Sequence, residues 1–576
     1  MLQNLQTVSL QDNTKRGAAD IAALLFVFIA SALPFIAASR FGIVNCDDYD
    51  YIRYVSEGKS IFGLGQAIFM PVTWLSYKLD ILLAHALNIG PARLAHVQSI
   101  VWHALNSVLL YCVFRRLFSG AGRFAAVAGA LLWAVHPLRV ESVVWIASRK
   151  DVVSMFFLLA AWLCWINSCR GRRLLLYPAS LLLMLLGCCA KPSVMVLPAA
   201  MMLSDVLVLS QRPALNRRGI EHFARPYLPF IVISGVTAVL ASIAQKAGGA
   251  MDVQQTIPFW WKACNAVASI GVYVKHLFYP FDLAPQCLVR WPGLPKGLLP
   301  GVAVCLIIAV LVAALAKRWR TPACGYALCG ILIFAVALLP MLGIVGFGIH
   351  AFADRFTYIP AVGFSVVAVA VLQGLRRGRS SIAVLPLAVA LLAVQSYRQS
   401  LHWRDDGTLW SHTIEVDGER NHEAQIALGL YHFEFGHDLD AAVDCFSKAF
   451  AANPERSGRI LFYWLLALCE KGDREAARRV YGDLSAWNAK KVREARAVGL
   501  DVGATIDYLV GRLVFLNGDP SFREMVKADG RELKERFPDN IHVKYLLYRL
   551  GELPAKDVTP SDPMEYVQYR YVRDCL

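Results

Sequence analysis

The chain has 576 residues, of which 57% are hydrophobic and 18% charged, whereas soluble proteins are about 45–50% apolar and about 25% charged. The apolar excess lies before residue 400, in long runs separated by short connectors rich in Arg, Pro or Gly. The net charge of +15 would favour nucleic acid as a partner of a soluble protein. Here much of it lies in loops between apolar runs, as in membrane proteins, so no nucleic-acid partner is expected.

The apolar runs predict an all-α, polytopic membrane helix bundle. A helix needs about 20 apolar residues to cross a bilayer, and the sequence provides about eleven such segments. They lie near 20–39, 96–114, 122–136, 152–168, 174–190, 193–210, 227–244, 298–316, 323–342, 360–375 and 381–397. The first follows Lys15 and Arg16, and we interpret it as an uncleaved anchor with a cytoplasmic N-terminus.

Basic loops predict the orientation of these segments. The loops lie at Arg115–Arg123, Arg170–Arg173, Arg212–Arg225, Lys317–Arg320 and Arg376–Arg379. Because cytoplasmic loops are enriched in Lys and Arg, we place all of them in the cytoplasm. The first long loop, 40–95, and the chain after residue 395 then face the outside.

The apolar segment 259–280 does not fit this alternation, because a further span there would move Lys317–Arg320 to the outside. We therefore expect an interfacial or re-entrant element on the outer face. Cys264 and Cys287 fall in this outer region and are candidates for a disulfide. Most other cysteines stand singly in apolar runs, where Cys behaves as a small hydrophobe.

The first outer loop begins with the acidic segment 45–51, which contains the adjacent Asp47 and Asp48. Two carboxylates at the mouth of a span can bind a divalent cation, act as a general base, or form a hydrated turn. The residues alone leave these alternatives open. Further along the loop, residues 70–80 are typical of an amphipathic helix on the membrane surface.

Other outer loops carry basic residues where the charge rule does not expect them. Segment 136–151 contains Arg139, Arg149 and Lys150, and a helix over 138–151 would place Glu141 and Arg149 on one face. A second cluster at 350–360 contains Arg355, and Lys191 adds another charge. Since Arg presents paired donors to phosphate, the clusters predict an anion site at the outer surface. The alternative is snorkelling at the ends of spans.

After Trp403 the pattern changes to paired soluble helices. Residues 426–454 fit the tetratricopeptide spacing if one residue is inserted, a looser copy follows at 462–484, and another helical pair is expected at 505–550. We divide the chain into a membrane domain, 1–400, and an α-solenoid of tetratricopeptide-like repeats, 401–576. Such arrays bind extended polypeptides, and a plain helical cap without a ligand is the alternative.

Six motifs in a fixed order carry a family resemblance. They are Asn45-x-Asp47-Asp48, Pro71-x-Thr73-Trp74-Leu75-Ser76, His136-Pro137-x-x-Val140-Glu141-Ser142, Arg149-Lys150-Asp151, Lys191-Pro192 and Asp354-Arg355-x-Thr357-Tyr358-Ile359-Pro360. Together they resemble bacterial membrane proteins with C-terminal tetratricopeptide repeats that are similar to the transmembrane-and-tetratricopeptide O-mannosyltransferases. Those in turn resemble the protein O-mannosyltransferases and the wider type-C glycosyltransferase fold. The resemblance covers nearly the whole chain.

The resemblance implies an inverting glycosyltransferase that moves a sugar from a polyprenyl-phosphate donor to an acceptor, with a protein hydroxyl favoured, outside the bacterial inner membrane. An acidic residue of the first loop would be the base. We favour Asp47, with Asp48 orienting it or contacting the acceptor or a Mg²⁺ or Mn²⁺ ion, and the choice between them stays open. The residues expected at the lipid phosphate are Arg149, Arg355, Lys191, Arg139, Lys150 and Tyr358, supported by His136, Glu141, Asp151 and Asp354.

Two other functions remain open. A lipid-phosphate hydrolase or phosphotransferase would use the two aspartates to hold Mg²⁺. A transporter or flippase would use the repeats to recruit a partner, and internal inverted repeats, which would support it, are not visible in the sequence.

Overall fold

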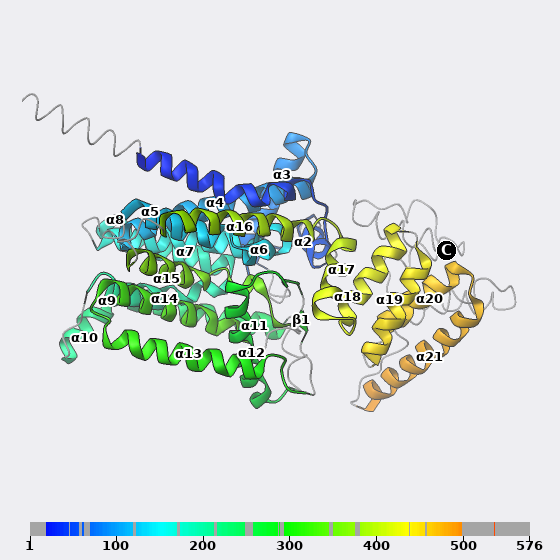
Figure 1. Ribbon diagram of the computed structural model, residues 1–576. Coiled ribbons are helices and arrows are strands. Elements are labelled where there is room, and N and C mark those ends of the chain that lie inside the picture. Colours follow the sequence, from blue (N-terminus) through cyan, green and yellow to red (C-terminus); the bar gives the residue numbers. More distant parts are fainter. Residues whose placement is uncertain are drawn as a thin grey trace, which may run out of the picture. The chain divides into compact units, whose positions relative to one another are not determined.

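The computed structural model describes residues 19–44, 46–56, 60–62, 69–118, 122–169, 173–211, 216–247, 257–285, 287–288, 293–344, 350–374, 381–436, 438–454, 458–497 and 535. The chain divides into two compact units, Met1–Asp405 and Asp406–Leu576, which are treated separately below (Figure 1).

The first unit is a bundle of apolar helices, which confirms the predicted all-α membrane fold. Within the described ranges, seven helices are long and apolar enough to cross a membrane. They are Ala19–Arg40, α4 (Pro91–Leu117), Ile146–Ser168 with α7 (Arg149–Ser168), α8 (Arg173–Ala190), Arg217–Ala247 with α11 (Leu228–Ala247), α13 (Leu298–Lys317) and Pro322–Met341 with α14 (Pro322–Leu338). A bent pair, α5 (Gly122–Ala134) with Pro137–Val144, makes eight if it counts as one span.

The other predicted spans are also helical. Two are short apolar helices, Pro192–Leu207 and Ala361–Gln373, which contain α9 (Leu197–Leu207) and most of α15 (Ala361–Gly374). The third is α16 (Ser381–Leu401). Each of the eleven apolar runs therefore contains a helix, although seven or eight, rather than eleven, reach the length and hydropathy of a span in the described residues.

The expected single helix over 138–151 is wrong. Pro137 follows His136, whose backbone is extended (φ −74°, ψ 136°), because proline disfavours helical geometry in the residue before it. A short helix, α6 (Val140–Val144), then ends at Trp145, which is also extended, and α7 begins four residues later. Glu141 and Arg149 consequently lie on different helices, and the bend between α5 and 137–144 is 59°.

Helix α12 (Phe259–Phe278) lies in the apolar segment 259–280, which did not fit the predicted alternation of spans. Asn265 and Ser269 both donate hydrogen bonds to the carbonyl of Ala351, at 2.9 and 3.2 Å, and Gly271 lies against Gly301 in the first turn of α13. These contacts join α12 to Ala351 and to the start of α13, and α12 is not among the candidate spans of the described residues. Cys264 carries a free thiol.

The first unit contains one short sheet in its described part. Strand β1 (Cys287–Leu288) pairs antiparallel with β2 (His350–Phe352), with Cys287 opposite Phe352. Helices α2 (Asp48–Ser56) and α3 (Pro71–Leu87) form the described part of the first loop. Strand β2 leads directly into the segment 354–358, so the sheet and α12 together hold that segment from one side.

Glycines allow the closest helix contact of the bundle, between α14 and α15. A Cβ atom on Gly330 would lie 2.5 Å from the carbonyl oxygen of Gly363, and one on Gly363 would overlap the carbonyl oxygen of Gly330. Membrane helices pack mainly by van der Waals contact and use small residues where their backbones approach. This pair therefore fixes the distance between the two helices.

Replacing Gly363 with Ala should lower the free energy of unfolding by about 1–3 kcal/mol, because the new methyl group forces two backbones apart. Gly235→Ala in α11 is the matched control, since nothing lies within 4 Å of a Cβ at that position. Thermal unfolding of the purified chain in detergent measures both. Equal melting temperatures for the two variants would contradict the packing described here.

The second unit consists of helix pairs in its described part. The helices are α17 (Asp406–Asp417), α18 (His422–Tyr431), α19 (Leu439–Ala452), α20 (Gly458–Lys471) and α21 (Arg474–Ala497). Gly429 of α18 lies against the ring of Phe446 in α19. A π-helical turn, His432–Gly436, follows α18, within the segment 426–454 for which the repeat spacing requires one inserted residue. Such turns absorb single insertions. The pair expected at 505–550 lies outside the described residues.

Candidate active site

The two adjacent aspartates have different environments. Asp48 is 1% exposed, and its two carboxylate oxygens accept hydrogen bonds from the backbone N–H groups of Val44 (3.3 Å) and Ala147 (2.7 Å). Asp47 is exposed, and its φ of 65° lies in the left-handed region that few non-glycine residues adopt. Asp48 is therefore a structural link, and Asp47 presents its carboxylate to the surroundings.

The first loop is attached to the segment around Trp145. The indole N–H of Trp145 donates to the carbonyl of Cys46 at 2.7 Å, next to the Asp48–Ala147 hydrogen bond. Both bonds join positions 99 residues apart in the chain. They fix the turn that contains Asp47 over the start of α7, where Arg149 and Lys150 lie.

Two of the predicted phosphate-binding cations, Arg149 and Lys191, form ion pairs with buried carboxylates. Arg149 is fully buried, forms an ion pair with Asp80 and donates to the carbonyl of Ala95 at 2.5 Å. Lys191 forms an ion pair with Asp151. In each case a buried carboxylate compensates the charge, because an unpaired buried ion is strongly unfavourable.

Arg139 is also fully buried, and it contacts neutral acceptors. Its guanidinium donates to the carbonyls of Thr357 (3.2 Å) and Tyr358 (3.0 Å) and to Oγ1 of Thr357 (2.7 Å). The hydroxyl of Tyr358 is 2.7 Å from Nδ1 of His103. Arg139 and Tyr358 thus hold the segment 354–358 against α4 and the residues after α5.

Arg355 and Lys150 lie on either side of Trp145. Arg355 forms an ion pair with Glu141, whose second oxygen accepts the Arg355 backbone N–H at 2.7 Å, and its guanidinium lies 5.0 Å from the Trp145 ring centre. Burial lowers the pKa of Arg355, but the Glu141 carboxylate outweighs it and raises that pKa above its ordinary value. Arg355 is therefore positively charged at every working pH.

Lys150 differs from the other cations. Its ammonium donates to the carbonyl of Ala147 (2.6 Å) and the hydroxyl of Tyr51 (3.3 Å), and it lies 5.0 Å from the Tyr51 ring centre. Within the described parts of the chain, no carboxylate lies within ion-pair distance of it. The charge of Asp47 nevertheless acts on Lys150 and on Tyr51, and Arg355 acts on both as well. Asp47, Lys150 and Arg355 therefore share one site.

The remaining supporting residues shape the loops. Nδ1 of His136 accepts the N–H of Leu138 (3.2 Å), and its Nε2 lies 3.1 Å from the carbonyl of Leu277 at the end of α12. Asp354 bonds to Nδ1 of His276, also in α12, at 2.8 Å. His136 and Asp354 thus connect α12 to the two segments that carry the site.

Part of the membrane unit is similar in sequence to a known protein family. Residues 81–238 match the family model described as dolichyl-phosphate-mannose-protein mannosyltransferase. This part of the membrane unit is similar to the protein mannosyltransferases. The matched region includes the segment 136–151 and Lys191, begins after Asp47 and ends before Arg355. It confirms, for this part of the chain, the resemblance that the motifs indicated.

Individual relatives agree with the family match. The mouse protein O-mannosyl-transferase TMTC3 is 32% identical over 100 residues, which are 17% of this chain and 10% of the mouse protein. Human TMTC1 is 34% identical over 101 residues, 17% of this chain and 11% of the relative. The Caenorhabditis elegans protein O-mannosyl-transferase F38B6.6 is 22% identical over 368 residues, 60% of this chain and 49% of the relative. The aligned regions thus span between about a tenth and a half of these curated relatives.

Three residues near these side chains were absent from the sequence-based set. Asp80 lies in the predicted amphipathic stretch 70–80. An acidic residue on the buried side of that helix could have indicated a buried cation as its partner. Tyr51 follows the aspartates, and its pKa is raised by burial and by the charge of Asp47. His350 lies near Lys150 and Arg355; burial and these two cations lower its pKa to about 3, so it is neutral.

The described residues do not gather a metal site. No group of three or more His, Cys, Asp or Glu side chains among them could hold a metal ion. Both oxygens of Asp48 accept backbone hydrogen bonds, so Asp48 is poorly placed to share an ion with Asp47. The geometry therefore favours the role of a base over that of a metal ligand for the acidic turn.

Asp48→Ala should lower the free energy of unfolding by roughly 1–3 kcal/mol, because it leaves the N–H groups of Val44 and Ala147 without their acceptor. Asp47→Asn should melt like the parent chain, since Asn tolerates a positive φ. Thermal unfolding in detergent compares the two. If Asp47→Asn were the less stable variant, the assignment of the two roles would be reversed.

The His276–Asp354 contact predicts a pH dependence of stability. Burial lowers the pKa of His276, but the Asp354 carboxylate outweighs it, and the net pKa lies above its ordinary value; Asp282 adds to the rise and Lys275 opposes it. A raised folded-state pKa gives stability that is complete below the unfolded-state pKa of about 6.5 and is lost as the pH rises through the folded-state value.

The melting temperature of the parent chain should therefore fall between about pH 6 and pH 9 by more than that of His276→Gln. The glutamine variant keeps a hydrogen-bond donor but has no titrating charge. Parallel melting curves for the two chains across this range would show that the ion pair contributes nothing.

Proposed function

We propose that the chain transfers a sugar from a polyprenyl-phosphate donor to an acceptor hydroxyl, with a protein as the favoured acceptor. The observation that carries the proposal is the exposed Asp47 carboxylate, held beside Lys150 and Arg355 in a membrane unit related to the protein mannosyltransferases. A base next to cations at the end of a helix bundle matches the needs of this reaction.

The acceptor hydroxyl requires a base. A hydroxyl is a weak nucleophile, and a carboxylate that accepts its proton during attack on the anomeric carbon typically accelerates such a step by about 10²–10⁴-fold. Asp47 is suited to this role because its carboxylate is exposed, whereas the oxygens of Asp48 are occupied.

The departing lipid phosphate requires positive charge. Lys150 has no carboxylate partner among the described residues, and Arg355 is held by Glu141 through one nitrogen, Nη1. Fixed charges that face a developing anion in a site of low polarity stabilise the transition state. We assign the phosphate to Lys150 and Arg355, with the neutral His350 beside them. Arg149, Lys191 and Arg139 then position the loops that carry the site.

The proposal includes the stereochemistry and location of the reaction. With one base and a direct displacement, the configuration at the anomeric carbon inverts. The site faces the periplasm of a bacterial inner membrane, with the N-terminus in the cytoplasm, because the charge rule assigns the Arg- and Lys-rich loops of the sequence to the cytoplasm. The helix pairs of the second unit, which we interpret as tetratricopeptide-like repeats, would present a polypeptide acceptor or partner.

Asp47→Asn should reduce transfer at least about 100-fold while the protein still inserts and folds, because the amide cannot accept the proton. The assay follows a labelled sugar from a polyprenyl-phosphate donor to a hydroxyl acceptor. Asp405→Asn, a change of the same kind at a half-buried residue that pairs with Arg404, is the control. Full activity of Asp47→Asn would disprove the catalytic assignment.

Lys150→Met and Arg149→Met, at adjacent positions, should fail in different ways. Lys150→Met should fold and lose affinity for the donor, seen as a raised KM, because no described carboxylate is left unpaired. Arg149→Met should unfold or fail to accumulate, since it leaves Asp80 buried without its partner, a loss of about 3–5 kcal/mol. If the Arg149→Met chain were stable and had a raised KM for the donor, Arg149 would have to be assigned to the phosphate site.

A further inference from the structure

Helix α10 (Arg217–Ala224) precedes α11, and two tyrosines fix the turn between them. The hydroxyl of Tyr177, near the start of α8, donates to the carbonyl of Pro226 at 2.9 Å. The hydroxyl of the buried Tyr227 donates to Asp205 of α9 at 2.5 Å. The turn between α10 and α11 is therefore attached to both α8 and α9.

The connection from α13 to α14 lies at the same end of the bundle. A Cβ atom on Gly325, in the first turn of α14, would lie 2.7 Å from the carbonyl oxygen of Trp319 and 2.8 Å from that of Leu207, the last residue of α9. Asp205, which holds the turn after α10, is two residues before Leu207. The end of α9 thus lies beside both that turn and the segment 317–321 (Figure 1).

The described segments 173–177, 216–227 and 317–321 together carry seven exposed cations and one carboxylate. The cations are Arg173, Arg217, Arg218, Arg225, Lys317, Arg318 and Arg320. The carboxylate is Glu221, which pairs with Arg217 at 2.8 Å. Most of this positive charge is therefore not compensated within these segments, unlike that of the buried cations at the candidate active site.

Helix α10 is amphipathic. At about 100° per residue, Arg217, Arg218 and Glu221 fall on one face of it. Ile220 and Phe223 fall on the other face, and Ile220 is 50% exposed. The 20 residues of α11 alone span about 30 Å, which is the thickness of the hydrocarbon core of a bilayer. Helix α10 therefore lies beyond the core, at the level of the lipid headgroups, as basic amphipathic helices do.

The start of α8 has the same combination of cations and apolar side chains. Leu174 and Leu175, which are 92% and 76% exposed, directly follow the exposed Arg173. Leu228, which is 54% exposed, follows the exposed Arg225 three residues later. Leucines in this position contact acyl chains, while the neighbouring cations reach the headgroups. The surface therefore fits a ligand that has both a phosphate and a hydrocarbon chain.

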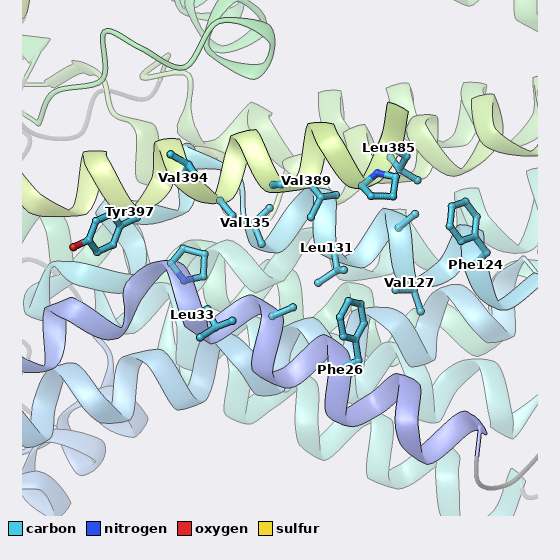
Figure 2. A pocket seen from close by; sticks show the side chains of 16 residues that line it. Phe26, Leu33, Phe124, Val127, Leu131, Val135, Leu385, Val389, Val394 and Tyr397 are labelled. Atoms are coloured by element: carbon cyan, nitrogen blue, oxygen red, sulfur yellow. The ribbon is translucent and has the colours of Figure 1, made fainter. Parts of the chain in front are cut away.

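The apolar groove between the first span, α5 and α16 lacks this combination (Figure 2). Its volume is about 500 Å³, and the described residues that line it are uncharged, with Tyr397 as the one hydroxyl among them. The groove has no group that would distinguish an anionic lipid from a neutral one. Selection by headgroup charge is therefore expected at α10 and not at this groove.

We propose that the surface formed by α10, the start of α8 and the segment 317–321 binds the headgroups of anionic phospholipids. The charge rule places these basic segments in the cytoplasm, so the lipids belong to the cytoplasmic leaflet. Each Lys or Arg near an anionic membrane surface strengthens such binding about fivefold. This binding takes no part in sugar transfer and does not depend on the proposed function.

Photocrosslinking of the full-length chain in phosphatidylcholine nanodiscs tests the proposal. The probe is a phosphatidylglycerol that carries a diazirine next to its headgroup. The expected result is labelling of peptides from the segments 173–177 and 217–227. Unlabelled phosphatidylglycerol in the nanodisc should suppress this labelling, whereas an excess of inorganic phosphate should not. Labelling spread evenly over the bundle, or suppression by inorganic phosphate, would overturn the proposal.

A triple variant with Arg173→Gln, Arg218→Gln and Arg225→Gln should reduce the labelling at least about tenfold, because the surface loses three cations. The control is a second triple variant at exposed positions of α21, which removes the same charge and should be labelled like the parent chain. Its changes are Arg474→Gln, Arg478→Gln and Arg493→Gln. Equal labelling of the two triple variants would contradict the proposal.

Glu221→Gln should act in the opposite direction. At a low concentration of the probe it should raise the labelling about fivefold, because it removes the carboxylate of α10 and releases Arg217 from its ion pair. A variant that only disturbed the fold would not gain affinity. Unchanged or reduced labelling of Glu221→Gln would contradict the proposal, even if the first triple variant failed to accumulate.

Discussion

The site depends on the two hydrogen bonds that the buried Asp48 carboxylate accepts. They join the end of the first span to the turn before α7, with the Trp145–Cys46 bond beside them. Inside a membrane protein no water is available to replace them, so their geometry is strongly determined. Their consequence is the exposed position of Asp47, at a backbone angle that a non-glycine residue adopts only when its surroundings enforce it. Asp48 orders the turn, and Asp47 keeps an exposed carboxylate that can act as the proposed base.

Around this turn, buried ion pairs hold the segments that carry the site. Arg149–Asp80 attaches α3 to α7, Lys191–Asp151 attaches the turn after α8 to α7, and Arg355–Glu141 attaches the segment after β2 to α6. Removing both members of such a pair can be tolerated, but removing one leaves an uncompensated charge. Most of the cations and carboxylates at this end of the bundle thus hold the segments together. They thereby fix the positions of the few charged residues that remain for the site.

The sequence predicted the helices and the location of the site better than it predicted the individual roles. Each of the eleven predicted apolar runs contains a helix, because length and hydropathy are local properties. The cations were also placed correctly at one end. Their partners were not predictable, since Arg149 and Asp80 are 69 residues apart in the chain and Arg355 and Glu141 are 214 apart. The break at Trp145 was missed as well, because nothing in its local sequence resembles the signal that Pro137 gives.

In the proposed function a lipid-linked sugar is displaced once, by one hydroxyl, with Asp47 as the one base. The anomeric configuration of the product tests this most directly. Purified chain would be incubated with a polyprenyl-phosphate donor of known configuration and a hydroxyl acceptor, and the product examined by NMR. The account predicts a glycoside of the opposite configuration to the donor. A product of retained configuration, or free sugar released without an acceptor, would contradict it.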